Sequence, residues 1–381
     1  MIKRTFWLEM VQAAWKRKSV VWLAGVRRSG KTFLCRSLPD VEFLDCELPR
    51  VRRMLEDPET FWESRAGRRV VLDEIHRLAD PSQVLKIAAD HFPSVRVLAT
   101  GSSTLAATAK FRDTLTGRKA VVWLTPMTLK DGADFGQTDL PHRLLRGGLP
   151  PHFMAGDWPE REYQEWMDAY WARDIQELFR LEKRAVFMKF TDMLLTSSGG
   201  IFEATRFARA CEANRGTITN YLATLETTFA AHVLRPYHGR KAEEIIHAPK
   251  VFMFDTGFVC AFRGWTTLRP EDVGGLWEHL VLNEMHARWQ MREVRYWRDK
   301  RGNEVDFILA PRGRPPIAIE CKSRPEAFEP AAMARFRVLH PGGKNYVICP
   351  HLKAAYIKRY KDLEVEFLPL EALFARVGNP L

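Results

Sequence analysis

A glycine-rich run at residues 25–32 has the residue types and spacing needed to bind a polyphosphate. The pattern Gly25-x-x-x-x-Gly30-Lys31-Thr32 lies between two apolar runs, in VVWLAGVRRSGKTFL. Glycines let the backbone curl so that successive N–H groups face phosphate oxygens, and the N-terminus of a following helix favours negative charge. Lysine in this pattern contacts the terminal phosphates, and the threonine hydroxyl ligates magnesium. We therefore expect ATP and Mg²⁺ as cofactors.

Two carboxylates follow a second apolar run, in VVLDEIH. This run is expected to be a strand beside the one that precedes the glycine-rich loop, so that its polar end faces the phosphates. Asp73 is expected to hold the magnesium ion through its water shell. Glu74 is expected to orient and polarise the attacking water. Together with Lys31 this set predicts ATP hydrolysis and not only ATP binding.

Two further residues are candidates for this site. Thr100, in VRVLATGSS, is expected to reach the γ-phosphate or its water, with Ser102 as an alternative in the same run. Arg118, just before another apolar run, is expected either to reach the γ-phosphate of an adjacent subunit as an arginine finger or to pair locally. The predicted catalytic residues are Glu74, Lys31 and Arg118; the nucleotide-binding residues are Gly25, Arg28, Ser29, Gly30, Lys31, Thr32, Phe33 and Thr100; the metal ligands are Thr32 and Asp73.

The elements that must position these residues alternate along residues 1–135, where short β-rich runs are separated by helical segments. This alternation predicts an α/β fold with a parallel sheet covered by helices. The expected strands are Val20 to Ala24, Val41 to Asp45, Arg69 to Leu72, Val95 to Thr100 and Ala120 to Leu124. Residues 136–186 become helical after the turn GGLPP and are expected to form a helical lid.

Residues 187–245 have the pattern of three short helices, a strand and a basic tip. This order predicts a winged helix-turn-helix whose second motif helix, about Gly216 to Thr228, enters the major groove of DNA. The expected contacts to phosphates or bases are Arg215, Thr217, Asn220, Arg235, Arg240 and Lys241. Such modules also serve as protein-protein contacts or as interdomain packing, and both alternatives stay open.

Residues 246–381 are expected to form a separate α/β domain with a cluster of charged side chains. Side chains alternate along a strand, so Glu320 and Lys322 share a face, and a hairpin neighbour can bring Asp306 beside them. This set resembles the restriction-endonuclease-like superfamily, in which acids hold magnesium and the lysine helps to activate water. The resemblance implies that Glu278, on the preceding helix, is a further acid, with Glu284 less favoured. A DNA-binding or structural relic is the alternative.

Composition limits the classes of protein that fit. The chain has 381 residues, of which 46% are hydrophobic and 28% charged, as in soluble globular proteins of two or three domains. Its formal charge of +11 favours a polyanion such as DNA, although a merely basic surface would give the same value. No apolar run approaches the ~20 residues needed to span a bilayer, and the N-terminus lacks the features of a signal peptide, so we expect a cytoplasmic protein with no membrane contact. The six scattered cysteines predict neither disulfides nor a structural zinc site.

Several motifs together resemble one family. They are similar to the motifs of prokaryotic AAA+ P-loop ATPases whose C-terminal part is a domain of unknown function. The motifs are GVRRSGKT, LDEIH, TGSS, the GR before a strand, GGLP and YWARDI. The resemblance implies an oligomer, such as a ring with ATP at subunit interfaces. We therefore expect an AAA+ ATPase that couples hydrolysis to DNA binding or remodelling, with a magnesium-dependent nuclease-like domain. The alternative is an ATP-dependent switch that binds a protein partner and has a catalytically silent C-terminal domain.

Overall fold

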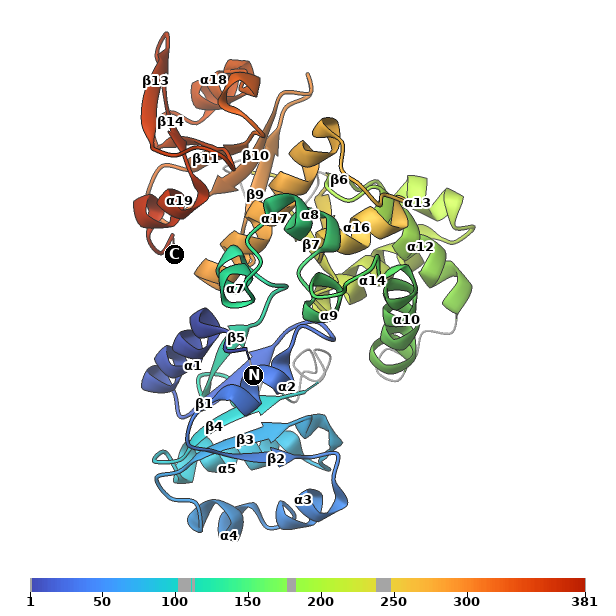
Figure 1. Ribbon diagram of the computed structural model, residues 1–381, viewed down its shortest axis with the longest axis vertical. Helices are drawn as coiled ribbons and strands as arrows, with labels where there is room; N and C mark the ends of the chain where they lie inside the picture. Colours follow the sequence, from blue (N-terminus) through green and yellow to red (C-terminus); the bar gives the residue numbers. More distant parts are fainter. Residues whose placement is uncertain (1, 102–110, 112–113, 177–182, 238–247, 381) are drawn as a thin grey trace. The chain divides into compact units, whose positions relative to one another are not determined.

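The computed structural model describes residues 2–101, 111, 114–176, 183–237 and 248–380. The chain divides into two compact units (Figure 1). The first unit comprises Met1–Asp139, Gly148–Arg184 and Ala223–Ala230, and the second comprises Leu140–Gly147, Ala185–Leu222 and Ala231–Leu381.

The first unit is built on a five-stranded sheet in which every pair of neighbouring strands is parallel. The strand order is β2-β3-β4-β1-β5 (Figure 1). The strands are β1 (Val20–Ala24), β2 (Val41–Asp45), β3 (Arg69–Asp73), β4 (Arg96–Thr100) and β5 (Lys119–Trp123). They agree with the expected strands to within about one residue at each end, so the predicted parallel α/β sheet is confirmed. The expectation that the strand ending in Asp73 lies directly beside β1 is wrong, because β4 pairs with both and lies between them. Buried β-branched residues in β1 and β3 explain the central strands, because such side chains suit a sheet covered on both faces.

Helices pack against this sheet and connect its strands. α1 lies on β1 and β5, α2 on β3 and β4, and α5 on β1. Asp57 and Asp80 cap α4 and α5 by accepting hydrogen bonds from backbone N–H groups, and a proline follows each cap. The helices are α1 (Thr5–Arg17), α2 (Lys31–Ser37), α3 (Pro49–Met54), α4 (Pro58–Glu63), α5 (Pro81–His91) and α7 (Leu129–Asp134).

The segment expected to form a lid is helical. It contains α8 (Leu140–Arg146), α9 (Pro150–Phe153), α10 (Glu160–Tyr170) and a wider, π-helical run at Trp171–Gln176. The structure places α8 in the second unit, whereas α9, α10 and the π-helical run belong to the first. Contacts with α16 (Thr256–Phe262) account for this division: Arg143 donates to the Thr256 hydroxyl, and the Cys260 thiol donates to the Leu144 carbonyl.

The second unit begins with helices around a small antiparallel sheet of order β6-β8-β7. The elements here follow one another as α12 (Arg184–Thr196), β6 (Gly200–Ile201), α13 (Ala204–Ala210), α14 (Arg215–Thr227), β7 (Ala231–Leu234) and β8 (Lys250–Met253). Of α14, residues 215–222 belong to this unit and residues 223–227 to the first. The predicted helices and the strand at β7 are present. The sequence reading did not identify β6 and β8, since β6 is only a two-residue strand and β8 lies beyond the expected boundary at residue 245.

The rest of the second unit is a six-stranded mixed sheet preceded by the long helix α17 (Pro270–Trp289), as the sequence predicts. The strand order is β13-β14-β12-β11-β10-β9. Hairpins join β9 to β10 and β10 to β11, while β11, β12 and β14 run parallel. The elements are β9 (Arg295–Arg298), β10 (Glu304–Leu309), β11 (Ile317–Cys321), α18 (Ala331–Leu339), β12 (Asn345–Ile348), β13 (Tyr356–Tyr360), β14 (Leu363–Leu368) and α19 (Leu370–Val377).

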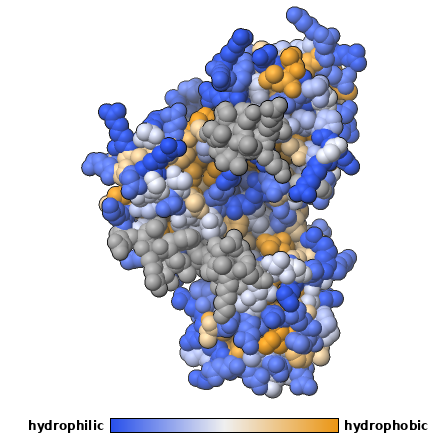
Figure 2. Space-filling model, turned by 180° about the vertical axis from the view of Figure 1, so that it is seen from behind, coloured by the Kyte–Doolittle hydropathy of each residue, from blue (hydrophilic) through white to orange (hydrophobic). Residues whose placement is uncertain are grey.

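The face of the molecule drawn in Figure 2 is mostly hydrophilic. On the face drawn in Figure 2, exposed apolar side chains gather only in small patches. Within the described residues, no helix combines the length and the apolar character needed to cross a bilayer. The six cysteines are buried and none forms a disulfide.

Candidate functional site

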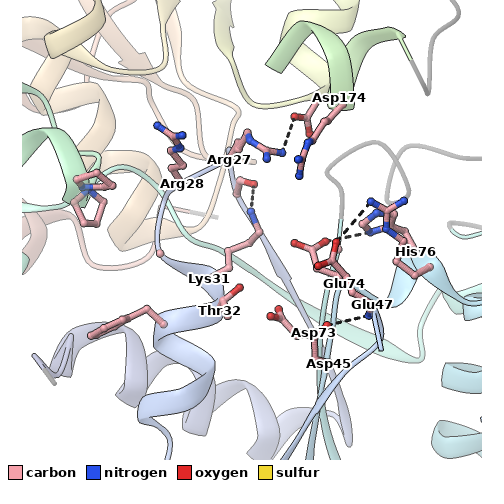
Figure 3. A pocket seen from close by; sticks show the side chains of 18 of the residues that line it. Arg27, Arg28, Lys31, Thr32, Asp45, Glu47, Asp73, Glu74, His76 and Asp174 are labelled. Atoms are coloured by element: carbon pink, nitrogen blue, oxygen red, sulfur yellow. Dashed lines mark hydrogen bonds and ion pairs between the residues drawn. The ribbon is translucent and has the colours of Figure 1, made fainter. Parts of the chain in front are cut away.

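The carboxyl edge of the parallel sheet opens into a cavity of about 590 Å³ (Figure 3). Its lining combines the loop after β1, the end of β3 and the π-helical run after α10, all within the first unit. Six of the eight predicted nucleotide-binding residues line it, namely Gly25, Arg28, Gly30, Lys31, Thr32 and Phe33. The remaining two, Ser29 and Thr100, are buried beside the cavity. The volume falls in the range of small-molecule and cofactor sites.

The loop after β1 has a backbone that requires glycine. Gly25 has φ +151°, and a Cβ built there would lie 2.4 Å from the Leu124 carbonyl oxygen. Gly30 has φ +94° and immediately precedes α2, whose first residue is Lys31. The Lys31 ammonium donates to the carbonyl oxygens of Gly25 at 2.9 Å and Val26 at 3.1 Å. Burial lowers the pKa of Lys31, and the charges of nearby carboxylates oppose that effect.

Asp73 is held beside Thr32 at the end of β3. Its carboxylate accepts hydrogen bonds from the hydroxyls of Thr100 and Thr32. Burial raises the pKa of Asp73, and these two hydrogen bonds oppose the shift. A hydroxyl and a carboxylate in contact beside the glycine-rich loop suit Mg²⁺, which binds to few protein ligands and completes its shell with phosphates and water. Within the described part of the chain, no group of three or more His, Cys, Asp and Glu side chains is arranged to hold a metal.

Glu74 projects into the same cavity from a left-handed residue, with φ +53°. Its backbone N–H donates to the Thr100 hydroxyl at 3.1 Å, which fixes the turn. Its carboxylate lies 3.2 Å from Nδ1 of His76 (Figure 3). Burial alone would raise the pKa of Glu74, but the hydrogen bond from His76 and the charge of Lys31 outweigh burial and lower it. Glu74 is therefore an ionised acceptor that lines the same cavity as Lys31.

The sequence reading assigned no role to several charged residues that line this cavity, among them Arg4, Arg27 and Asp174. Arg27 faces Asp174 of the π-helical run, and Arg4 lies at the N-terminal end of α1. The Arg4 guanidinium is 1% exposed, forms a two-point contact with Asp131, and donates to the Ser29 carbonyl at 2.7 Å. Arg4 therefore holds the glycine-rich loop in place through the Ser29 carbonyl. The motif YWARDI contains Asp174, but only the fold shows what Asp174 faces.

Arg118 lies at the amino end of β5, away from the residues that line the cavity. Its Nε donates to Asp90 at 2.7 Å, and both side chains are about one third exposed, with values of 36% and 29%. The structure therefore contains the local ion pair that was the alternative to an arginine finger. Its role toward an adjacent subunit stays a prediction.

In the second unit, the four predicted nuclease residues lie in one cluster. Asp306 and Glu320 come from neighbouring strands, and Asp306 accepts the Cys321 N–H at 2.8 Å. The Lys322 ammonium lies 2.6 Å from Glu320 and 3.9 Å from Asp306. Burial, and then the charge of Asp306, raises the pKa of Glu278 to about 7. The less favoured Glu284 is fully buried on α17, near Arg288.

Two residues of this cluster were not identified from the sequence. The Lys250 ammonium, from β8, lies 2.6 Å from both Glu278 and Glu304. Burial would lower the pKa of Lys250, but the charges of Glu278, Asp306 and Glu304 outweigh burial and raise it. Two lysines therefore occupy positions between the acids, so the side chains as they stand form ion pairs and not a set of metal ligands. No local motif marks Lys250, because its partners are distant in sequence.

The residues predicted to contact DNA lie partly on α14. Arg215 and Asn220 are exposed, Thr217 is half-buried, and Arg235 is exposed just after β7. The Asn214 side chain accepts the Thr217 N–H at 2.7 Å and so caps the start of this helix. The predicted contacts Arg240 and Lys241, and the sensor alternative Ser102, lie outside the described residues.

Three family models match successive parts of the chain. Residues 17–132 match an AAA domain. Residues 137–269 match a domain of unknown function, DUF8612, and residues 273–373 match another, DUF4143. The first match contains the glycine-rich loop, Asp73 and Glu74. The descriptions of the other two matches name no activity.

Similar proteins are also found among curated sequences and solved structures. Uncharacterized proteins of Mycobacterium tuberculosis and Mycobacterium bovis are each 28% identical over 357 residues, covering 88% of this chain and 79% of the relative. The Walker-type ATPase of Pyrococcus abyssi covers 69% of this chain and 96% of its own, with 16% identity and a TM-score of 0.43. A DNA clamp loader delta protein of Bacillus subtilis covers 58% and 88%, with 12% identity and a TM-score of 0.27. These low TM-scores do not establish the fold. The AAA match over residues 17–132, and the cavity that Gly30, Lys31 and Glu74 of that segment help to line, support a P-loop ATPase of the AAA type.

Proposed function

We propose that this protein hydrolyses ATP at the first-unit cavity and couples hydrolysis to DNA binding or remodelling. The observation that carries the ATPase proposal is the meeting of Lys31, Thr32 and Glu74 in one cavity, with Asp73 in contact with Thr32. These side chains come from two separate parts of the chain, which the parallel sheet brings to one edge.

Each side chain has a defined task in this proposal. The backbone of the glycine-rich loop and Lys31 bind the phosphates, while Thr32 and Asp73 would hold Mg²⁺. When bound, Mg²⁺ neutralises charge that develops on the phosphates. Glu74 orients the attacking water and accepts its hydrogen bond, and its low pKa keeps it ionised for this task. Thr100 positions both acids, because it donates to Asp73 and accepts from the Glu74 N–H.

DNA is the partner that the second unit favours in this proposal. The order helix, strand, helix, helix, strand, strand from α12 to β8 is that of a winged helix-turn-helix, and its sheet order supports this reading. In such a module α14 is the helix that would enter the major groove, and it presents Arg215 and Asn220 to solvent. The net charge of +11 favours electrostatic binding of a polyanion such as DNA.

The first test of this proposal is ATP turnover with and without DNA. We expect magnesium-dependent hydrolysis that rises when single-stranded, double-stranded or branched DNA is added, and DNA binding that weakens steeply as salt is raised. Phosphate release and the mobility shift of labelled DNA are the measurements. Turnover that responds to no DNA, together with no salt-sensitive shift, would contradict DNA coupling and favour an ATP-dependent switch that binds a protein partner.

A second candidate activity is magnesium-dependent cleavage of DNA by the C-terminal cluster. The specific observation in its favour is that Asp306, Glu320 and Lys322 meet on adjoining strands, with Glu278 close enough for the Asp306 charge to act on it. This arrangement is the one expected of a restriction-endonuclease-like fold. Lys250 and Lys322 now neutralise these acids, so a metal ion would have to displace at least one ammonium group.

Asp306→Asn should abolish any magnesium-dependent cleavage, because it removes a charge from the centre of the cluster while keeping the shape of the side chain. Its expected effect on ATP turnover is small, since Asp306 belongs to the second unit. The measurement is the size of end-labelled DNA recovered after incubation with Mg²⁺. The exposed Asp362→Asn, in the same unit, is the matched control. Cleavage that persists in Asp306→Asn, or none in the unmodified protein, would reject this activity.

A further inference from the structure

A wider helical turn places two charged side chains in the nucleotide cavity. α10 continues without a break into the π-helical run Trp171–Gln176. Arg173 and Asp174 of this run line the same cavity as Lys31 and Glu74. π-Helical turns are rare and are frequently found at functional sites. The run therefore marks a second wall of the site, opposite the glycine-rich loop (Figure 3).

Arg27 of the glycine-rich loop faces Asp174 across this part of the cavity (Figure 3). The Arg27 Nη1 atom lies 3.7 Å from Oδ2 of Asp174, and the two side chains are 28% and 13% exposed. Within the described residues, Nε of Arg27 and Oδ2 of Asp174 are buried without a hydrogen bond. The pair is therefore an ion pair that lacks direct hydrogen bonds, and both groups keep capacity for a better partner.

The backbone at Arg27 is fixed, so only its side chain is left to change partner. The Trp166 indole N–H donates to the Arg27 carbonyl at 3.0 Å. Trp166 stacks on Tyr170, with ring centroids 5.0 Å apart, and the Tyr170 hydroxyl hydrogen-bonds Thr228. These contacts tie α10 to the loop. The long side chain of Arg27 can turn while its Cα stays in place.

A terminal phosphate is a stronger partner for a guanidinium than a carboxylate at 3.7 Å. Phosphate oxygens accept two parallel N–H bonds from arginine, and a γ-phosphate brings charge that ADP lacks. Resting on the ATP site proposed above, we propose that Asp174 and the γ-phosphate compete for the guanidinium of Arg27. The pair then distinguishes ATP from ADP, and Asp174 is a positioning residue that acts through Arg27.

The competition between Asp174 and the γ-phosphate for Arg27 weakens the binding of ATP. Asp174 is largely buried, and burial raises its pKa while the positive charges of Arg27 and Lys31 oppose the shift. A carboxylate that loses Arg27 to the γ-phosphate therefore loses the partner that stabilises its charge, which disfavours ATP. After hydrolysis and phosphate release, Arg27 returns to Asp174. Asp174, on the π-helical run, is therefore paired with Arg27 in the ADP state and has lost that partner in the ATP state.

The test is a double-mutant cycle with Asp174→Asn, Arg27→Gln and the combined variant. Affinities for ADP and for the non-hydrolysable analogue β,γ-imido-ATP are measured by calorimetry with Mg²⁺. Asp174→Asn is expected to tighten analogue binding about tenfold and to change ADP binding little. Arg27→Gln is expected to remove most of the preference for the analogue. The combined variant should resemble Arg27→Gln alone, because Asp174 acts only through Arg27. Asp168→Asn, an exposed acid on α10 that pairs with Arg184, is the matched control.

Equal changes in analogue and ADP affinity in Asp174→Asn would overturn the proposal, since a merely structural residue would produce them. Additive effects in the cycle would overturn it as well. A failure of the ATP site itself gives a different result, in which Lys31→Ala binds both nucleotides as well as the unmodified protein does. If Asp174→Asn fails to fold, Arg27→Gln with an unchanged preference for the analogue still rejects the proposal.

Discussion

Lys31→Ala should weaken ATP and ADP binding by about a hundredfold or more, the loss expected when a desolvated charge pair is deprived of one partner. Lys31 is the first residue of α2 and the only lysine that lines the described cavity. Its ammonium now donates to two loop carbonyls, and these are contacts that a phosphate oxygen can replace without moving the backbone. Calorimetric titration with each nucleotide in the presence of Mg²⁺ is the measurement.

The matched control for this change is Lys16→Ala, an exposed lysine in the last turn of α1. It removes the same charge from the same unit and should leave nucleotide affinity unchanged. Circular dichroism must show that both variants keep the helical content of the unmodified protein. Nucleotide binding by Lys31→Ala at unmodified affinity would mean that the cavity is not the ATP site.

The parallel sheet was predictable because each of its strands is a short apolar run with its own signal. VVWLA and VVLD are continuous runs of buried residues; the glycine-rich loop directly follows the first, and the second ends in Asp73 with Glu74 next to it. Strand ends and site residues are therefore adjacent in sequence. For the same reason Lys31, Thr32 and Asp73 could be assigned to one site before the fold was known.

Residues whose partners lie far apart in sequence could not be assigned in this way. Arg4 pairs with Asp131, and Arg27 pairs with Asp174. Each of these residues looks like an ordinary charged surface residue in its own segment. Only the folding of α1 and α10 onto the loop region turns them into buried groups of the site. Helical periodicity identifies such helices but does not specify which distant loop they pack against.

In the second unit, too, residues with sequence-distant partners could not be assigned from the sequence. Asp306, Glu320 and Lys322 were predictable because they lie on a hairpin, where alternation along two strands fixes which side chains share a face. Lys250 comes from β8, in a different sheet, and its position beside Glu278 depends on how α17 packs. Its presence changes the charge of the cluster, since the Lys250 ammonium forms ion pairs with both Glu278 and Glu304. The sequence predicted Lys322 among the acids but not the second lysine, Lys250, or its partner Glu304.

Glu74→Gln should leave ATP binding unchanged and slow hydrolysis by about a hundredfold to ten-thousandfold, the range for loss of a general base. Glutamine has the shape of glutamate but cannot accept a proton from water at neutral pH. The Glu74 N–H bond to Thr100 involves only the backbone, so the turn at the end of β3 should survive. Measurements of steady-state phosphate release and of ATP affinity, made on the same preparation, separate the two effects.

The exposed Glu63→Gln, on α4, is the control for this prediction, because it makes the same substitution in the same unit outside the cavity. Turnover near the unmodified rate in Glu74→Gln would remove Glu74 from its role as the base. Loss of ATP affinity together with turnover would instead assign Glu74 to binding. Retained affinity with lost turnover is expected because, in the proposed site, Glu74 acts on the attacking water while Lys31 and the loop backbone hold the nucleotide. The Glu74 carboxylate contacts His76 and lines the cavity.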